Sequence, residues 1–306
     1  MIASAPDESA FRRVGLGYGT SAYIIWGLIP LLFAAAAPTG AFEIVAHRII
    51  WSLIFCAVLL FFARGFTRTW KIVRSGRTFG LLALASVLIA INWTTYVYGI
   101  ESGHLVEISL GYYLNPLISI GLGVILLKEK LRPLQWAAVG VGAVAVIVVG
   151  LGLGRFPYLA LTVALSFGLY GLVKNKVGGT VGALEGMTVE TAVLTIPSIG
   201  FLLYLASQGV GTFTGFGAWH VVILLATGPL TAIPLILFGA AARRIPLSWV
   251  GMLQYIAPTM QFILGVAVFG ETMSTTRWIG FLIIWIAVIL LCTDMIRQSR
   301  RHPRIG

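Results

Sequence analysis

The chain has 306 residues, of which 58% are hydrophobic and only 10% charged, and its mean hydropathy is +0.97. Soluble domains carry roughly 25% charged residues, so this composition excludes a soluble protein and indicates an integral membrane protein. The net charge of +11 is typical of cytoplasmic loops rich in Lys and Arg, so we expect no nucleic-acid partner.

Ten apolar segments are long enough to cross a bilayer. The first follows Arg13 and has about 20 apolar residues, which is longer than the apolar core of a signal peptide. No connecting segment is long enough to hold a soluble domain. We therefore expect an all-α integral membrane protein with ten transmembrane helices, at approximately 15–35, 44–62, 78–99, 105–127, 133–152, 156–174, 187–206, 219–241, 246–269 and 277–295.

The positive charges predict the orientation of the chain. If both termini lie in the cytoplasm, 18 of the 21 Lys and Arg residues fall on the cytoplasmic side. Only Arg155 and Arg277 fall on the outer side, and Arg48 falls inside a span. We expect a multi-pass protein of the inner (cytoplasmic) membrane, with a tail at 1–14 and a basic tail at 296–306, both cytoplasmic.

Two stretches of the chain repeat each other at an offset of 142 residues. The offset also aligns Glu43 with Glu185 and Arg48 with Glu190. Because each half holds five spans, an odd number, the halves are expected to be inserted upside down relative to each other, as in secondary transporters. The predicted inverted repeats are 15–152 and 156–295. The matched residues are Tyr113, Pro116, Leu122-Gly123-Val124, Glu129 and Trp136 with Tyr255, Pro258, Leu264-Gly265-Val266, Glu271 and Trp278.

Pro116 and Pro258 both fall near the middle of a span, and polar and aromatic residues gather around them. Proline removes a backbone hydrogen bond, and the freed carbonyl needs a neighbouring group or a water-lined cavity. A simple packing kink is the alternative. The symmetric placement favours a substrate cavity between the halves. The candidate cavity residues are Trp26, Arg48, Asn92, Trp93, Tyr96, Glu107, Tyr112, Asn115, Pro116, Gln254, Tyr255, Pro258 and Gln261.

Charged residues inside the spans are a second signal, because a charge at mid-helix costs about 2.5–3.5 kcal/mol on insertion scales. Arg48 and Glu107 lie at similar depth near the outer side, so we predict that they form an ion pair or together line an outer vestibule. Glu190 is predicted at the matching inner position. Snorkelling of these side chains to the interface is the alternative. Glu107 is the residue expected to titrate if transport is coupled to protons.

Other charges are expected to serve the helix ends. Asp294 is within reach of Arg297, and Lys174 is expected to be an interfacial anchor. Glu129 and Glu271 are expected to be helix-end charges that fix a turn. The sequence has no phosphate-binding G-x-x-x-x-G-K-[ST] loop and no H-E-x-x-H or G-x-S-x-G motif, so we expect no enzyme, no cofactor and no metal.

Several longer motifs resemble one known family, the RarD branch of EamA permeases in the drug/metabolite transporter superfamily. The resemblance covers nearly the whole chain. It implies ten helices, cytoplasmic termini and a central cavity walled by spans one to four and six to nine, with spans five and ten peripheral. The motifs include Ser21-Ala-Tyr-x-x-Trp26-Gly27, Glu43-x-x-x-His47-Arg48-x-x-Trp51-Ser52, Gly103-His104-x-x-Glu107-x-Ser109-Leu-Gly111-Tyr112-x-x-Asn115-Pro116 and Gln254-Tyr255-Ile-x-Pro258-Thr-x-Gln261-Phe262.

The sequence therefore predicts a secondary active transporter that moves a small organic metabolite or drug across the cytoplasmic membrane by alternating access. Proton coupling and a homodimer through spans five and ten are further hypotheses. The alternatives are a facilitative carrier without ion coupling and a non-transporting membrane sensor or assembly factor. A channel is disfavoured, because no ring of like charges and no carbonyl filter is visible.

Overall fold

The computed structural model describes residues 8–128, 130–177 and 180–301. All the regular elements in these ranges are helices, which fits the expected all-α class. The helices are α1 (Glu8–Ala35), α2 (Ala41–Phe62), α3 (Phe66–Arg74), α4 (Gly76–Glu101), α5 (Leu105–Leu127), α6 (Pro133–Leu153), α7 (Tyr158–Val177), α8 (Ala183–Ser207), α9 (Ala218–Ala242), α10 (Leu247–Leu253), α11 (Ile256–Ile263), the π-helical η1 (Leu264–Val268) and α12 (Thr275–Arg301).

Nine helices within the described ranges are long and apolar enough to cross a membrane, and the segment 249–268, from α10 to η1, counts as one of them. The sequence predicts ten spans, and the difference is the segment 156–174, which forms α7. The last turn of α7 carries Lys174 and Lys176, which lower its hydropathy. The apolar pattern does not predict α3, a short helix with Arg68, Lys71 and Arg74 that links α2 to α4.

The outer surface of the bundle carries many large apolar residues, and several charged residues are buried inside it. Phe62 on α2 and Ile196 on α8 expose 77% and 79% of their surface, whereas Arg48 and Glu107 expose only 5% and 1%. Lipid requires backbone groups to be bonded within the segment, which helices achieve. It also favours polar side chains that face the interior. The exposed apolar surface is therefore suited to lipid.

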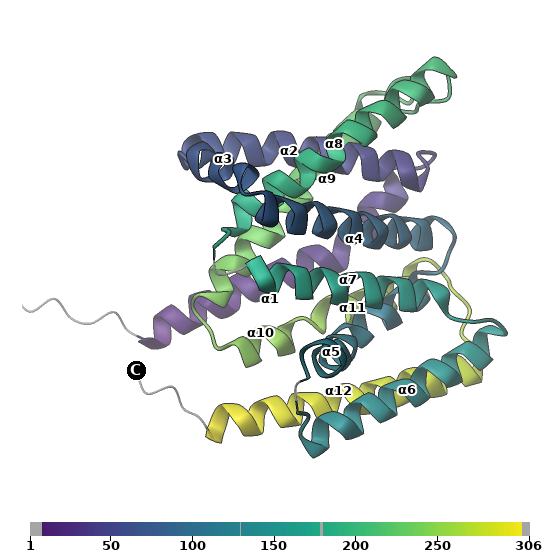
Figure 1. Cartoon of the computed structure of the whole chain (residues 1–306). Coiled ribbons are helices and arrows are strands. Elements are labelled where there is room, and N and C mark those ends of the chain that lie inside the picture. The colour runs from purple at the N-terminus through teal and green to yellow at the C-terminus, as the bar shows by residue number, and fades with distance from the viewer. Residues whose placement is uncertain (1–7, 129, 178–179, 302–306) are drawn as a thin grey trace, which may run out of the picture.

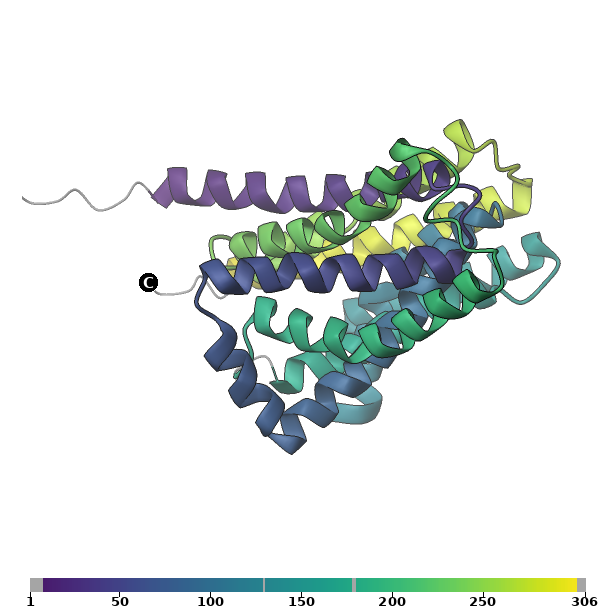
Figure 2. The same ribbon diagram turned by 90° about the horizontal axis from the view of Figure 1, so that it is seen from above.

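The helices run roughly along one direction, and the start of α1 lies at the same end of the bundle as the end of α12 (Figure 1, Figure 2). We call this the basic end, because α3, which carries Arg68, Lys71 and Arg74, also lies there. Helices α6 and α12 lie side by side at one edge, far from α2 and α8 (Figure 1). One apolar core joins α1, α2, α4, α5, α7 and α9, and a second joins α5, α6, α7, α11 and α12.

The two mid-span prolines have different effects on their helices. A turn at Gln254–Tyr255 separates α10 from α11, and Pro258 lies in the first turn of α11. Pro258 has no N–H to bond the carbonyl of Gln254, which accounts for the break. At Pro116, by contrast, α5 is one continuous helix. Helices α6 and α7 pack along it, and neighbouring helices allow a transmembrane helix to tolerate proline.

Close packing of α5 on α7 depends on Gly111. A Cβ atom at this position would lie 2.5 Å from the backbone oxygen of Ala160, so the two helices could not approach as they do. We predict that Gly111→Ala lowers the stability of the purified protein in detergent by about 1–3 kcal/mol, the usual cost of overpacking. Thermal unfolding measures this.

Gly121→Ala is the matched control on the same helix, because its Cβ would meet no atom within 4 Å. It should leave the unfolding temperature unchanged or raise it slightly, since alanine favours helix over glycine. Equal effects of the two substitutions would mean that the contact between Gly111 and Ala160 does not limit the packing.

Candidate functional site

Arg48, on α2, lies at the centre of a group of aromatic side chains. Its guanidinium carbon lies 4.1 Å from the centroid of the Trp93 ring and 5.6 Å from that of Phe33. Its Nε donates to the hydroxyl of Thr231 at 2.8 Å. These residues come from α1, α2, α4 and α9, so four helices hold one buried cation.

Tyr96 extends the group towards α5 and α11. Its ring meets those of Phe33 and Tyr112 edge to face, with centroids 6.1 and 5.6 Å away. The amide of Gln261, on α11, donates to the Tyr96 hydroxyl and to the carbonyl of Trp26, both at 3.3 Å. The Oε1 atom of Gln261 is buried and accepts no hydrogen bond from the described residues.

Asn92 fixes the position of α7 against α4 and α5. Its side-chain amide donates to the carbonyl of Val163 at 2.9 Å and to Ser166 at 3.2 Å, and its Oδ1 accepts from Tyr112 at 3.3 Å. Asn92 is therefore a buried side chain that links α4 to α5 and α7 and lies beside the aromatic group. The structure thus brings together seven of the predicted cavity residues: Trp26, Arg48, Asn92, Trp93, Tyr96, Tyr112 and Gln261.

Tyr255 belongs to a different place. Its ring stacks on Tyr113 at 6.2 Å, in the apolar core that α5 and α11 share with α6 and α12. Asn115 is buried with its Oδ1 unpaired among the described residues, and Pro258 is also buried. Pro116 and Gln254, the other two predicted cavity residues on these segments, are partly buried.

The predicted ion pair between Arg48 and Glu107 is replaced by another. Glu107 pairs with Arg155 at 2.7 Å, and its second oxygen accepts from the backbone N–H of Leu159 at 3.1 Å. Glu107 therefore binds both the loop before α7 and the first turn of α7. The favourable charge at a helix N-terminus explains why Glu107 takes this position.

Glu190, the repeat counterpart of Arg48, has partners on α7. Lys174 pairs with it at 2.5 Å, and the Tyr170 hydroxyl donates to it at 3.1 Å. Lys174, which the sequence predicts to be an interfacial anchor, therefore also compensates a buried carboxylate. Asp294 likewise pairs with Arg132, at the start of α6, and not with Arg297 as expected.

Glu271 caps a helix from a distant part of the chain. Its carboxylate accepts from the backbone N–H groups of Leu105 and Val106, the first two residues of α5, and Arg277 lies 4.0 Å away. Burial raises the pKa of Glu271 above its usual value, and the two backbone donors act in the opposite direction. The expected helix-end role of Glu271 thus takes the form of a cap; Glu129 lies outside the described residues.

Several partners could not be found from the sequence. Thr231 and Phe33 lie in ordinary apolar spans, and Arg155 lies in a loop 48 residues after Glu107. The repeat offset pointed to Glu190 but not to Lys174. Only spatial proximity identifies these residues.

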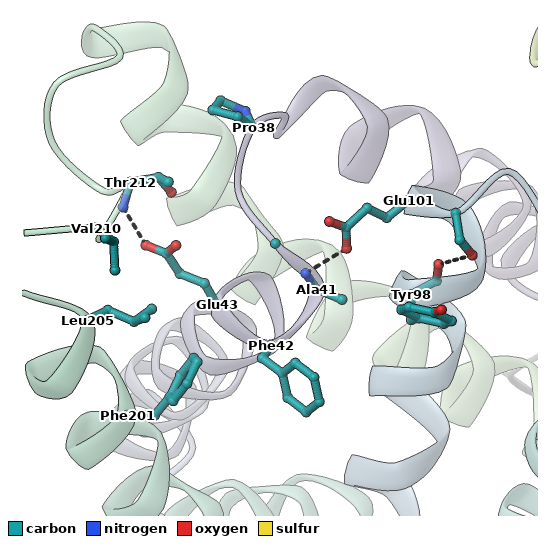
Figure 3. Close-up of a pocket in the computed structure, with 12 residues that line it drawn as sticks. Pro38, Ala41, Phe42, Glu43, Tyr98, Glu101, Phe201, Leu205, Val210 and Thr212 are labelled. Carbon is teal, nitrogen blue, oxygen red and sulfur yellow. Dashed lines mark hydrogen bonds between the residues drawn. The ribbon is translucent and has the colours of Figure 1, made fainter. Parts of the chain in front are cut away.

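A groove of about 610 Å³ opens at the end opposite the basic end. It lies between the start of α2 and the ends of α4 and α8, and none of the predicted cavity residues lines it. Its two carboxylates already have partners: Glu43 accepts from Thr212 at 2.7 Å and Glu101 from Ala41 at 2.9 Å (Figure 3). The groove is therefore a surface feature separate from the Arg48 group.

The new partner of Glu107 can be tested by a double-mutant cycle. We predict that Glu107→Ala and Arg155→Ala are each destabilising, and that the double variant is less destabilised than their sum by about 1–2 kcal/mol, because groups in contact couple. Denaturant unfolding in mixed micelles measures this. The control cycle pairs Glu107→Ala with Arg48→Ala and should be additive within about 0.5 kcal/mol. Coupling in the control cycle alone would restore the pairing predicted from the sequence.

Comparison with known proteins gives a consistent result. Residues 13–151 match the EamA-like transporter family. Protein RarD of Streptomyces exfoliatus is 47% identical over 95% of this chain and 91% of its own length. An uncharacterized transporter of Pseudomonas aeruginosa is 41% identical over 97% of this chain and 99% of its own. A solved crystal structure that is 16% identical shares the fold, with a TM-score of 0.58 over 93% of this chain and 98% of that one. The chain is a multi-pass membrane protein that belongs to the RarD-like group of the EamA transporter family.

Proposed function

We propose that the protein is a secondary transporter that carries a small organic molecule across the cytoplasmic membrane by alternating access. The observation that carries this proposal is the group around Arg48, where polar and aromatic side chains from both halves of the chain meet inside an apolar bundle. Carrier sites lie at the interface of two repeats. The transporter family of the chain supports the same reading.

The helix packing supports two inverted repeats. If α1, α2, α4, α5 and α6 are exchanged with α7, α8, α9, α10–η1 and α12, most of the packing pairs are preserved. Helix α1 packs on α9 as α7 packs on α4, and α1 packs on α11 as α7 packs on α5. The pairs α2–α8, α5–α11 and α6–α12 map onto themselves. Such a pattern is expected of two halves related by a two-fold axis.

Two carboxylates follow the same exchange. Glu43, at the start of α2, accepts from Thr212 in the link between α8 and α9. Glu185, at the start of α8, pairs at 2.9 Å with Arg68 on α3, in the link between α2 and α4. The offset of 142 aligns the two glutamates. In each half, the glutamate at this aligned position therefore binds the corresponding link of the other half.

We also propose that α7 is the tenth crossing. Its 20 residues give a length of about 30 Å, which equals the thickness of the hydrocarbon core. It starts beside Glu107 at the head of α5 and ends beside Glu190 in α8, so it connects the two ends of the bundle. A tenth crossing brings both termini to one side, and the charge bias places that side in the cytoplasm.

Carriage without ion coupling is the second candidate function. The buried carboxylates Glu43, Glu107 and Glu190 each already bind a backbone N–H, a cation or both. A proton on any of them would have to displace these donors. The buried ion pairs therefore favour a facilitative carrier over a proton-coupled one.

Transport by the purified protein tests the proposal. Proteoliposomes loaded with a small-molecule extract of the native host are expected to release a limited set of compounds faster than protein-free liposomes, as measured by mass spectrometry of the external medium. A pH gradient should change the final distribution beyond the change seen in protein-free liposomes only if transport is proton-coupled. Release identical to that from protein-free liposomes would contradict a transport function.

The broken helix supplies a structural control in the same assay. We predict that Pro258→Ala slows release severalfold with little loss of stability, because it lets the Gln254 carbonyl gain a helical hydrogen bond and stiffens the turn between α10 and α11. Pro116→Ala should have a smaller effect, since α5 is already continuous. Equal rates for both variants and the unaltered protein would mean that the break serves packing alone.

A further inference from the structure

Arg48 has more hydrogen-bond donors than the protein satisfies. A guanidinium carries five N–H donors. Nε uses one of them on Thr231, and no residue in the described part of the chain accepts from the two Nη groups. The Thr231 hydroxyl donates to the carbonyl of Thr227 at 2.7 Å, which leaves it free to accept from Arg48. Thr231 therefore holds the guanidinium in one orientation, and the two Nη groups at its outer edge have no acceptor among the described residues.

Arg48 also lacks a counter-ion among the described residues, which sets it apart from the buried carboxylates. Glu107, Glu190 and Asp294 each have a basic partner within 2.7 Å, whereas the neighbours of Arg48 are rings and a hydroxyl. Cation–π contacts give about 0.5–2 kcal/mol, which offsets only part of the cost of burying a charge. A buried cation that is oriented and left unneutralised is suited to an anion that comes from outside the protein.

We propose that Arg48 binds the carboxylate of the transported molecule, and that the class of substrate is an organic monocarboxylate with an apolar or aromatic body. This inference rests on the proposed transport function. The guanidinium edge matches a carboxylate in a two-point contact. The rings of Trp93 and Phe33 lie against the guanidinium, and Tyr96 and Tyr112 continue the aromatic group beyond Phe33, so the rest of the molecule would meet largely apolar side chains.

The charge of the site decides between carboxylate and phosphate. A phosphate monoester carries a charge of about −1.5 to −2 at neutral pH, whereas a carboxylate carries −1. Within the described residues, Arg48 is the one basic side chain that contacts the aromatic group. One guanidinium neutralises a carboxylate fully but would leave a phosphate with an uncompensated charge in a buried site, which is costly.

Binding to the purified full-length protein in detergent tests the assignment. The probes are phenylacetate, 3-phenylpropionate and hexanoate, each compared with the amine, the alcohol and the phosphate ester built on the same body. Binding is measured by the shift in unfolding temperature and by the change in tryptophan fluorescence, to which Trp93 contributes. We expect at least one carboxylate to bind, and to bind at least tenfold more tightly than its amine, alcohol and phosphate counterparts.

Variants of Arg48 locate the binding. Arg48→Gln should weaken carboxylate binding by about tenfold to a hundredfold, the equivalent of one charged hydrogen-bonding interaction. Arg48→Lys keeps the charge but loses the planar edge, so it should bind with intermediate affinity and provides a test if the glutamine variant does not fold. Arg74→Gln is the matched control, because Arg74 also lies over a tryptophan, Trp70 at 5.2 Å, but on the exposed helix α3. It should leave binding unchanged.

The outcomes separate the substrate class from the transport function. Failure of every carboxylate to bind, or binding that is equal in the unaltered protein and both Arg48 variants, overturns the assignment. If amines or alcohols bind and cross proteoliposome membranes while carboxylates do not, the transport function stands and the monocarboxylate class is wrong. If carboxylates bind through Arg48 but no probe crosses, the site is supported and the transport function is wrong.

Discussion

The cost of burying charge inside an apolar bundle governs how this protein is built. Its deep carboxylates are each held by a group from another part of the chain: Glu107 by the loop before α7, Glu190 by Lys174 on α7, and Glu43 by the link between α8 and α9. These contacts join helices that apolar packing alone would not place in register. Arg48 follows the opposite rule, since it is buried, oriented by a hydroxyl and left without an anion among the described residues.

This difference separates structural charges from a candidate binding charge. A carboxylate that already accepts hydrogen bonds from two donors, as Glu107 does, gains little by binding a substrate. The protein loses stability if this carboxylate releases its partners. A guanidinium with unused donors gains from an incoming carboxylate. The same interior can therefore hold charges that lock helices together and one charge that remains available for a ligand.

The two halves are alike in packing and unlike in detail. Exchange of the halves preserves most of the helix pairs that touch, yet α5 is continuous where its counterpart is broken into α10, α11 and a π-helical turn. Glu190 also stands where the first half has Arg48. The proposed carrier needs two arrangements of similar energy. On that proposal, the break between α10 and α11 serves as the joint of one half and Arg48 as the ligand-binding cation of the other.

Much of the fold follows from the sequence, because lipid allows few solutions for a long apolar segment. Nine of the ten expected spans are among the candidate spans, and the tenth, α7, differs because Lys174 and Lys176 end it. The residues around Arg48 could be predicted as a group, since polar and aromatic residues in an apolar chain are rare and point inwards. Their partners could not: Arg155 lies in a loop and Thr231 in an ordinary span, and only the three-dimensional packing brings them to Glu107 and Arg48.

The central claim is that two inverted halves rock about the site that contains Arg48. It is tested most directly by spin labels at the ends of α4 and α9, the third long helices of the two halves, with one pair at each end of the bundle. The pair at Ser102 and Ala218 reports on the end opposite the basic end, and the pair at Arg77 and Arg243 on the basic end. Pulsed electron resonance in lipid nanodiscs, with and without a bound carboxylate, should show that one distance shortens as the other lengthens. Distances that stay fixed, or that change in the same direction, would contradict the account.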